Sequence, residues 1–243
     1  MTSGEDLMAS MKTARYFTKL GLCKGYWQVP MNEKDIPKTA FVTQDGHYEF
    51  TRMPFGLVNS GATLVKGIRN FLRGVNNVGT YIDDIIIYTE SWQEHVQTMD
   101  QILQLLEEAN LTLKTSKCSF GQEQKEFIGH IISNGELKPN QDNINKVKNA
   151  EPPRTKKEIQ SFLGLTGYYR NFIPNYSAIA APLTDLTKRG LPNIVEWKGP
   201  QDKAYHTFKN IITRSPILHL PDFRKGFYLR TDASNIGLGA ILM

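Results

Sequence analysis

Two adjacent aspartates, Asp83 and Asp84, interrupt an apolar, strand-forming run over residues 80–88. Adjacent residues of a straight strand point to opposite faces, so one carboxylate would face the core, where it is costly without a partner. A hairpin turn at this pair removes the conflict. Two interpretations remain open: an Asp-Asp turn at the surface, or a metal site, since paired carboxylates supply the oxygen ligands that Mg²⁺ prefers. Phosphoryl transfer by two metal ions would also need a carboxylate from a neighbouring strand.

Basic residues form two groups that could contact a polyanion. Lys66, Arg69 and Arg73 fall together on one face of a predicted helix, away from its apolar stripe. A second group, which includes Lys156 and Lys157, belongs to a basic segment that follows residue 137. Basic side chains bind phosphates with sequence-independent, salt-sensitive affinity, so we expect weak, non-specific binding of nucleic acid.

Hydrophobic periodicity predicts the elements that must position these groups. The two aspartates belong to a strand, a turn and a second strand over residues 78–90, and the first basic group belongs to a helix over residues 60–74. Capping boxes at Ser91–Glu94 and Thr155–Glu158 open two more helices. The remaining predictions are strands and turns over residues 15–57 with a hairpin at Gln44–Gly46, a strand over Glu126–Ile132, a helix at about 201–213 and a strand from Phe227 to Thr231.

Composition narrows the class of protein. The 243 residues are 40% hydrophobic and 22% charged, which excludes wholesale disorder. The net charge of +5 permits a nucleic-acid partner without requiring one. The two cysteines, Cys23 and Cys118, lie far apart, which argues against a disulfide framework and a structural zinc site. Since no apolar run is long enough to span a bilayer, we expect an intracellular protein, cytoplasmic or nuclear, with no membrane partner.

The sequence Tyr81-Ile82-Asp83-Asp84 after a strand, with Met53–Ser60 upstream, resembles the motifs of reverse transcriptases. Other segments follow in the order found in that family. The chain most resembles the reverse transcriptases of gypsy-type (Metaviridae) long-terminal-repeat retrotransposon polyproteins. The further matching segments are Lys19–Gln28 (first palm strand), Arg52–Asn59 (nucleotide and template loop), Phe127–Ile132 (primer-grip hairpin), Ser161–Arg170 (thumb helix) and Leu229–Ser234 (start of the RNase H domain).

The resemblance implies an α+β fold, in which a reverse-transcriptase palm (an antiparallel sheet packed on helices) carries partial fingers, a helical thumb and a truncated RNase H-like start. It also implies a chain that lacks most of the fingers and stops within the RNase H domain. The implied division is residues 1–57, partial fingers and first palm strand; 58–137, palm with the Tyr-Ile-Asp-Asp hairpin and primer grip; 138–190, thumb; 191–226, tether or connection; and 227–243, truncated RNase H start.

The resemblance implies catalytic roles for a few residues. Asp83 would ligate a metal ion, with Asp84 as its less direct neighbour, and Lys117 would lie near the leaving pyrophosphate. A solvated loop lysine is the alternative interpretation of Lys117. Asp232 would be the first of four RNase H carboxylates. Because one carboxylate cannot hold two metal ions, we expect no RNase H activity from this chain.

Other residues take implied binding roles. Tyr26 would be the aromatic gate that excludes a 2′-hydroxyl from the nucleotide pocket, or else a core aromatic of a strand. Arg52 would assist at that pocket, or would be an exposed strand arginine. Tyr168 and Tyr169 either pack against the primer duplex or belong to the helix core. The implied pocket lining is Phe55, Gly56 and Asn59, and the implied primer grip is Phe127, Ile128, Gly129 and His130.

The chain departs from the family pattern at one functional position. The first palm strand of the family has the sequence Lys-Leu-Asp-Leu, whereas this chain has Lys19-Leu20-Gly21-Leu22. Gly21 therefore stands where a carboxylate would bridge the metal ions, and glycine offers no ligand. Metals supply most of the electrostatic stabilisation in phosphoryl transfer, so we expect activity lower by several orders of magnitude.

Three functions remain open. The first is a fragment of an RNA-directed DNA polymerase, a nucleotidyltransferase that would use two Mg²⁺ (or Mn²⁺) ions, an RNA or DNA template with a primer strand, and deoxynucleoside triphosphates, with catalysis lost through Gly21. The second is a non-catalytic nucleic-acid-binding protein on the same fold. The third is the remnant of a decaying element. The oligomeric state stays open.

Overall fold

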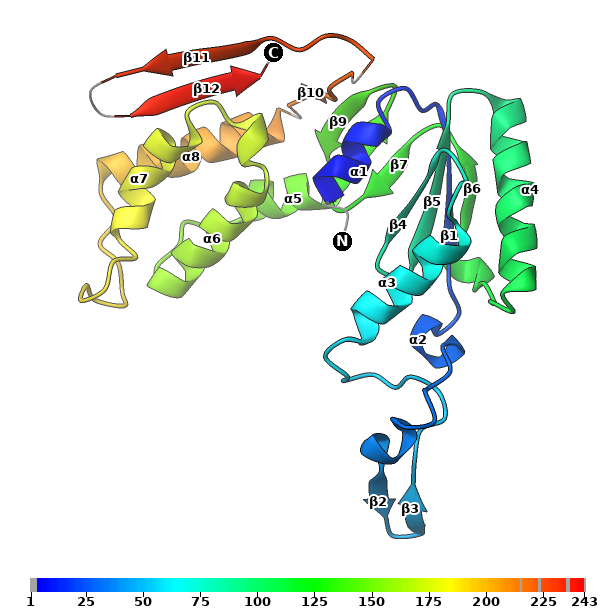
Figure 1. Ribbon diagram of the computed structural model, residues 1–243. Coiled ribbons are helices and arrows are strands. Elements are labelled where there is room, and N and C mark those ends of the chain that lie inside the picture. The colour runs from blue at the N-terminus through cyan, green and yellow to red at the C-terminus, as the bar shows by residue number, and fades with distance from the viewer. Residues whose placement is uncertain (1–3, 215, 223, 235–236, 243) are drawn as a thin grey trace.

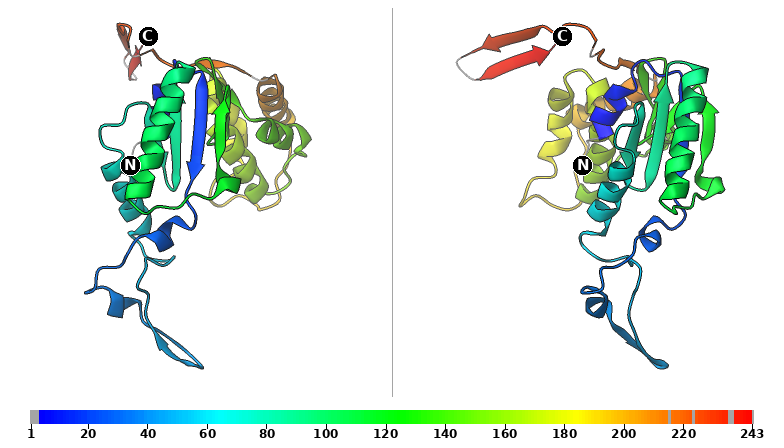
Figure 2. Two further views of the ribbon diagram at one scale, coloured as in Figure 1. Left: turned by 90° about the vertical axis from the view of Figure 1, so that its right-hand side faces the viewer. Right: turned by 45° about the vertical axis from the view of Figure 1, so that its right-hand side comes forward.

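The computed structural model describes residues 4–242 except for 215, 223 and 235–236. Antiparallel strands and helices form separate regions, which confirms the α+β class. A sheet lobe and a helical lobe lie side by side with a second sheet between them, and two hairpins lie apart from this body (Figures 1 and 2). No helix in the described part of the chain has the length and apolar character needed to cross a bilayer.

The sheet lobe is built on a sheet of order β4-β5-β1-β6, in which every pairing is antiparallel. Side chains alternate between its two faces, so Ile85 and Ile87 enter one core and Ile86 enters the other. The register of β1 and β5 places Gly21 directly opposite Asp84. The strands are β1 (Tyr16–Gly21), β4 (Val78–Tyr81), β5 (Asp84–Thr89) and β6 (Ser119–Gln122).

Helices cover both faces of this sheet. α3 (Ser60–Phe71) and α4 (Trp92–Glu108) pack in the core that holds Ile85 and Ile87, whereas α1 (Gly4–Ser10) packs in the core that holds Ile86. α4 begins at the predicted capping residue, since the Ser91 hydroxyl accepts a hydrogen bond from the Glu94 N–H at 3.3 Å. Short helical turns connect the strands; these are α2 (Gly25–Gln28), η1 (Ile36–Thr39) and η2 (Thr115–Lys117).

The second sheet, of order β10-β9-β8-β7, lies between the lobes (Figure 1). The segment Glu126–Ile132, predicted as one strand, is divided between two strands because Ile128 and Gly129 both adopt positive φ and turn the chain. The fourth strand comes from far along the sequence, after the helical lobe, and Leu220 beyond it is buried. The strands are β7 (Lys125–Phe127), β8 (His130–Ser133), β9 (Glu136–Pro139) and β10 (Leu218–His219).

Four helices form the helical lobe around a core of their own. The capping box predicted at Thr155 and Glu158 is present at the start of α6. α8 falls within residues 191–226, where we expected a tether, and it packs into the lobe: Tyr205 is buried with its ring 5.0 Å from that of Phe162. The helices are α5 (Gln141–Asn149), α6 (Lys156–Tyr168), α7 (Tyr176–Asp185) and α8 (Gly199–Thr213), with the short 3-10 turn η3 (Arg170–Phe172) after α6.

Two hairpins complete the fold. β2 (Phe41–Thr43) and β3 (Gly46–Tyr48) form the hairpin predicted at Gln44–Gly46, and it projects away from the sheet lobe (Figure 2). β11 (Leu229–Ala233) and β12 (Leu238–Leu242) form the other. Neither hairpin pairs with a further strand among the described residues.

His95 fastens α4 to the first sheet through two threonines. Its Nε2 lies 2.7 Å from Thr18 Oγ1 on β1, and its Nδ1 lies 2.9 Å from Thr89 Oγ1 on β5. The imidazole is fully buried. Burial lowers the pKa of His95, and the charge of Glu94 opposes this only in part. His95 is therefore neutral at pH 7, and its protonation would leave a buried charge in the sheet lobe.

We expect the free energy of unfolding to fall as the pH falls below about 6.5, because the unfolded chain then binds a proton that the folded His95 resists. The variant His95→Gln should lose part of this pH dependence and cost about 1–3 kcal/mol at neutral pH through disturbed buried hydrogen bonds. Urea unfolding between about pH 7.5 and about pH 5.5 measures both effects. The matched control is His47→Gln, at an exposed position of β3. An unchanged pH slope in His95→Gln would contradict the prediction.

Candidate active site

Asp83 and Asp84 lie at the hairpin between β4 and β5, as the strand-alternation argument predicted. Ile82 and Asp83 form the turn, and Asp84 is the first residue of β5, paired with Tyr81. Ile82 has a φ of 55°, in the left-handed region that β-branched residues avoid. Residues held in such conformations cluster at functional sites. The turn leaves both carboxylates partly exposed, by 35% for Asp83 and 23% for Asp84.

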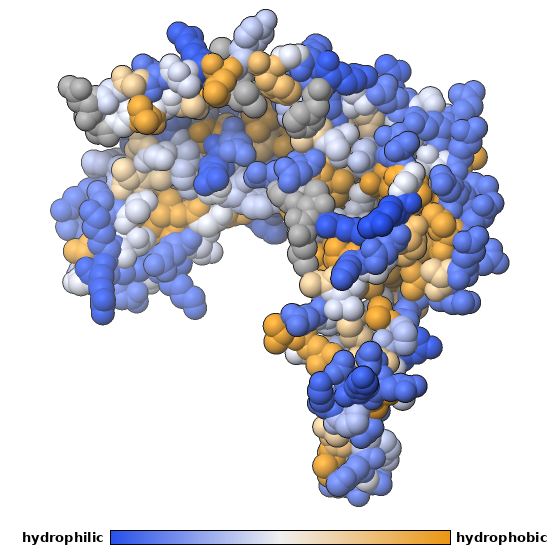
Figure 3. Space-filling view, in the orientation of Figure 1, coloured by the Kyte–Doolittle hydropathy of each residue, from blue (hydrophilic) through white to orange (hydrophobic). Residues whose placement is uncertain are grey.

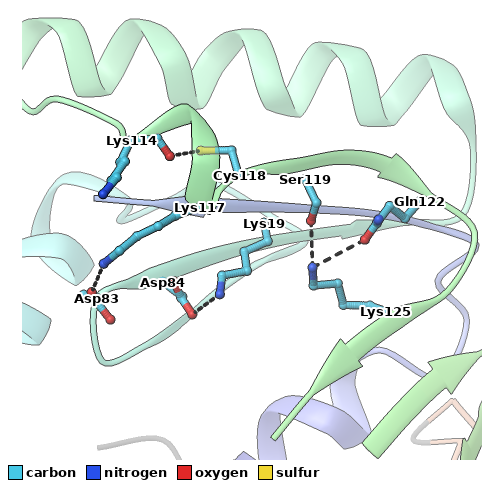
Figure 4. Close-up of polar contacts among 9 residues, drawn as sticks. All are labelled: Lys19, Asp83, Asp84, Lys114, Lys117, Cys118, Ser119, Gln122 and Lys125. Atoms are coloured by element: carbon cyan, nitrogen blue, oxygen red, sulfur yellow. Dashed lines mark hydrogen bonds and ion pairs between the residues drawn. The ribbon is translucent and has the colours of Figure 1, made fainter. Parts of the chain in front are cut away.

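Each of these carboxylates is paired with a lysine (Figure 4). The Nζ of Lys19 lies 2.7 Å from Asp84 Oδ2, and the Nζ of Lys117 lies 3.4 Å from Asp83 Oδ2. The structure thus brings together all three predicted catalytic residues. Lys19 was not predicted as a partner, although its place two residues before Gly21 puts it on the face of β1 that Asp84 shares. Because the pairs are partly exposed, solvent screens their contribution to stability.

A further lysine, Lys125 of β7, lies on the Lys19 side of the two ion pairs (Figure 4). It is buried, and its Nζ donates to Ser119 Oγ at 2.7 Å and to Gln122 Oε1 at 3.4 Å. Burial lowers the pKa of Lys125, the positive charge of Lys19 lowers it further, and Asp84 acts in the opposite direction. The lowered pKa makes Lys125 easier to deprotonate than an exposed lysine.

The residues present do not fit a pair of divalent ions. Such a site needs a carboxylate from the neighbouring strand, and the residue of β1 opposite Asp84 is Gly21. Among the residues that the structure describes, no three His, Cys, Asp or Glu side chains come together as metal ligands. Asp83 and Asp84 instead face ammonium groups, which repel a divalent cation.

Some of the predicted nucleotide residues lie at an open cavity of about 390 Å³. Phe55 and Gly56 line it, and Tyr26 packs edge-on against Phe55 with ring centroids 5.4 Å apart. Tyr26 is half-buried on the short helix α2, so it is not the core aromatic of a strand. Trp27, which we did not predict, also lines the cavity. The adjacent aromatic residues Tyr26 and Trp27 were the sequence signal from which the role of Trp27 could have been predicted.

Arg52 and Asn59 do not line this cavity. The Nη1 of Arg52 donates to the Gln28 carbonyl oxygen at 3.1 Å, which ties the loop after β3 to the end of α2. Asn59 precedes α3, and its side chain makes no capping hydrogen bond. Both residues are exposed. Arg52 is therefore an exposed residue that fixes the loop, while Asn59 is an exposed residue at the start of α3.

The turn that holds the predicted primer grip, between β7 and β8, is held by two tyrosines from α6 and its C-terminal cap. Ile128 has a φ of 44° and Gly129 a φ of 64°. Tyr168 Oη donates to the Ile128 carbonyl, and Tyr169 Oη donates to the Gly129 carbonyl at 2.7 Å and accepts from Asn143 Nδ2 at 2.7 Å. Tyr169 is fully buried, whereas Tyr168 is 46% exposed. Tyr169 thus belongs to the core, and Tyr168 keeps part of its ring in solvent.

The other two predicted primer-grip residues are anchors inside the protein. Phe127 is buried against Tyr81 of β4, with ring centroids 5.3 Å apart in an edge-on contact. The Nδ1 of His130 lies 2.7 Å from the Ile128 carbonyl oxygen. Burial lowers the pKa of His130, so the neutral ring donates its Nδ1 proton to this carbonyl. These contacts link the turn to the strand that precedes the two aspartates.

The basic residues predicted to contact a nucleic-acid backbone lie on helices that border a hollow between the two lobes (Figure 3). Lys66 on α3 and Arg73 just beyond it are exposed, whereas Arg69 is half-buried. At the start of α6, Lys157 is exposed, and Lys156 Nζ donates to a carbonyl of the loop after α7 at 2.7 Å. Lys66, Arg73 and Lys157 are the members that face solvent most fully.

Asp232, the predicted RNase H residue, lies far from this site. It is an exposed residue of β11, opposite Gly239 on β12, and the hairpin lies beyond the helical lobe (Figure 1). Its Oδ1 accepts a hydrogen bond from the Ala233 N–H at 3.0 Å. The fold therefore separates Asp232 from Asp83 and Asp84.

Comparison with known families accounts for this arrangement. The family described as reverse transcriptase (RNA-dependent DNA polymerase) matches residues 1–132, which is more than half of the chain. The chain belongs to the reverse transcriptase family. An RNase H-like domain found in reverse transcriptase matches residues 197–243, a stretch that includes α8 as well as the β11–β12 hairpin.

Similar proteins are Pol polyproteins of retrotransposons. The chain is 43% identical over 240 residues to the retrovirus-related Pol polyprotein from transposon 297 of Drosophila melanogaster, covering 98% of the chain and 23% of that relative. It is 35% identical over 256 residues to the gypsy polyprotein of the same fly, covering 100% and 24%. It is 36% identical to the transposon Tf2-3 polyprotein of Schizosaccharomyces pombe, covering 98% and 18%. The chain thus spans about a quarter or less of these relatives.

Solved structures with the same fold include a foamy viral protease–reverse transcriptase. One form, in complex with double-stranded DNA, superposes with a TM-score of 0.88 at 25% identity and covers 96% of this chain and 41% of that one. A second, also with double-stranded DNA, gives a TM-score of 0.84 at 26% identity, covering 94% and 48%. The likeness confirms the predicted palm-and-thumb fold class.

We expect Tyr169→Phe to lower the free energy of unfolding by about 1–3 kcal/mol, because it leaves the Asn143 amide without its buried partner and removes one of the two hydrogen bonds to the Gly129 carbonyl, which also accepts from the Asn140 N–H at 3.0 Å. Tyr168→Phe is the matched control, since it removes one hydrogen bond at an exposed edge and should cost less. Equilibrium denaturant unfolding measures both variants. Equal losses would show that Tyr169 is not the principal anchor of the turn.

Proposed function

We propose that this chain is part of a retrotransposon reverse transcriptase that holds a primer–template duplex but extends the primer poorly. Gly21 carries the proposal. It lies opposite Asp84, so the carboxylate turn has no third ligand from the neighbouring strand. The family supports an RNA-directed DNA polymerase, and the missing ligand argues that nucleotidyl transfer with Mg²⁺ or Mn²⁺ is weak in this chain.

In this proposal the predicted parts keep their order along the chain. The sheet lobe corresponds to the first palm strand of 1–57 and the palm of 58–137, and α5–α7 correspond to the thumb of 138–190. Residues 191–226 contribute α8 to the same helical core before the RNase H-like hairpin of 227–243. The nucleic acid would lie in the hollow between the sheet lobe and the helical lobe.

Charge and neighbouring structures support a duplex as the partner. Foamy viral enzymes of this fold have been solved with double-stranded DNA and with an RNA/DNA hybrid. In this chain Lys66, Arg73 and Lys157 would bind phosphates on either side of the hollow. Recognition of a duplex by shape and backbone needs no base-specific contacts. The primer-grip turn, fixed by Tyr169, would support the primer strand.

A deoxynucleoside triphosphate is the proposed small-molecule partner. Tyr26 and Phe55 would pack against its sugar and base at the cavity beside α3. Lys117 is the residue that would meet the phosphates, yet its ammonium is engaged with Asp83. We therefore expect the triphosphate to bind weakly, and the duplex to bind without it.

Duplex binding tests this function directly. Without divalent ions, an RNA/DNA primer–template should bind at low salt and dissociate well below about 0.5 M salt, because phosphate contacts dominate. The double variant Lys66→Ala/Arg73→Ala should weaken binding and reduce the slope of log affinity against log salt by about two. Fluorescence anisotropy measures both quantities. The matched control is Lys203→Ala/Lys225→Ala, which removes the same charge at exposed positions outside both basic groups. Equal slopes in the two double variants would contradict the proposed surface.

Primer extension tests the proposed loss of catalysis. With an RNA template and Mg²⁺ or Mn²⁺, we expect no extension by this chain above that of Asp83→Asn, because both lack a complete ligand set. The Asp83→Asn variant is the background control. Clear extension that depends on Asp83 would contradict the inactivity, while leaving duplex binding as a separate result.

The third function, the remnant of a decaying element, is distinguished from a duplex-binding protein by the same anisotropy measurement. A folded chain that fails to bind the duplex at low salt would favour the remnant. We also propose an intracellular location, cytoplasmic or nuclear. Cys23 and Cys118 support it, since both thiols are free.

A further inference from the structure

Lys117 occupies the space that a side chain on Gly21 would need. A β-carbon added to Gly21 would lie 2.6 Å from Lys117 Cβ, 3.2 Å from Lys117 Cδ and 3.3 Å from the Lys117 carbonyl oxygen. The backbone of Gly21 does not have a left-handed φ, so its conformation would accept any residue. Glycine is required here by the position of Lys117.

The η2 turn that carries Lys117 is fastened to the end of β1. The Lys114 N–H donates to the Gly21 carbonyl oxygen at 2.9 Å, and the Lys117 N–H closes the turn on the Lys114 carbonyl at 2.8 Å. The thiol of Cys118 donates to the same carbonyl at 3.3 Å. Lys117 Cβ therefore cannot retreat from Gly21 by a side-chain rotation, because the contact at 2.6 Å involves the atom next to the backbone.

The far end of the same side chain lies at the carboxylate turn. Lys117 Nζ is 3.4 Å from Asp83 Oδ2, beside the pair formed by Lys19 and Asp84 (Figure 4). The stem of the Lys117 side chain thus occupies the space that a side chain at position 21 would need. Its ammonium group places a positive charge beside Asp83. An ammonium group brings one charge and three donors, and it cannot bridge carboxylates as a divalent ion does.

We propose that Lys117 is the resident counter-cation of Asp83 and excludes a divalent ion there by charge and by volume. The inference rests on the proposed loss of the two-ion site, and it deepens that proposal. Gly21 and the position of Lys117 form one coupled change. Restoring an aspartate at position 21 alone would force the new Cβ against Lys117, so the single reversion would neither fit nor rebuild the site.

Manganese binding by the full chain tests this proposal without reference to activity. Electron paramagnetic resonance measures the concentration of free Mn²⁺. Each variant is measured with and without the additional substitution Asp83→Asn, and the Mn²⁺ binding that this substitution removes is the Asp83-dependent binding. The variants are Lys117→Ala, Gly21→Asp, Gly21→Asp/Lys117→Ala and Gly21→Asp/Lys117→Gly. Lys114→Ala is the matched control, because it removes a lysine charge from the same loop but from a residue that forms no ion pair with Asp83 among the described residues.

The wild-type chain and Lys114→Ala should show no Asp83-dependent binding at millimolar Mn²⁺. Lys117→Ala, at a residue 45% exposed and therefore tolerant of substitution, should gain roughly threefold or more in Asp83-dependent affinity through loss of the competing charge. Gly21→Asp should gain nothing and should unfold at a lower temperature. Gly21→Asp/Lys117→Gly should bind at least about tenfold more tightly than Gly21→Asp/Lys117→Ala, which keeps the obstructing Cβ.

Three results would overturn the proposal. These are Asp83-dependent binding by the wild-type chain, a gain in Gly21→Asp equal to that in Gly21→Asp/Lys117→Gly, and no gain in Lys117→Ala. The last variant keeps the test decisive if the double variants fold poorly. Failure here is distinguishable from failure of the proposed function, because duplex binding is measured without divalent ions and does not involve Lys117.

Discussion

The pairing of β1 with β5 is the constraint on which the rest of the site depends. Its register places Gly21 opposite Asp84 and puts Lys19 on the same face, while β4 returns to form the turn that carries Asp83. A shift of one residue in the register would move every side chain of a strand to the opposite face of the sheet. The isoleucines of β5 enter cores on both faces. Hydrophobic burial therefore fixes the positions of the two carboxylates, independently of the residue that lies opposite them on β1. A glycine at position 21 leaves that scaffold intact.

A polar network of a different kind joins the two lobes. Tyr169 is buried at the end of α6 and bonds to the turn between β7 and β8, whose residues adopt left-handed conformations. Strained turns of this kind persist only when the surroundings hold them. The hydrogen bonds of Tyr168, Tyr169 and His130 to the two carbonyls supply that support. The strand with Tyr81 packs on Phe127, so the β4–β5 hairpin and the helical lobe meet through the same few residues.

Local sequence signals predicted much of this architecture. The capping residues at Ser91 and Thr155, the Asp-Gly hairpin and the placement of Asp83 and Asp84 at a turn depend on contacts within a few residues, and the structure confirms them. The resemblance identified the family and the fold class. What sequence could not supply were contacts between distant segments. The ion pair between Lys117 and Asp83, the packing of α8 in the helical core and the Asn143–Tyr169 hydrogen bond all join residues whose proximity only the folded chain defines.

The return of the chain at β10 has a mechanical consequence. The helical lobe leaves the second sheet after β9 and comes back to pair with that same strand, where Leu218 lies opposite Leu137 and Leu220 is buried. Both ends of the lobe are therefore attached to one strand. Tyr168 and Tyr169 add a third attachment away from that strand, at the turn between β7 and β8. Three attachments that do not lie on one line oppose both sliding and rotation, so the second sheet sets the orientation of the helices relative to the hollow.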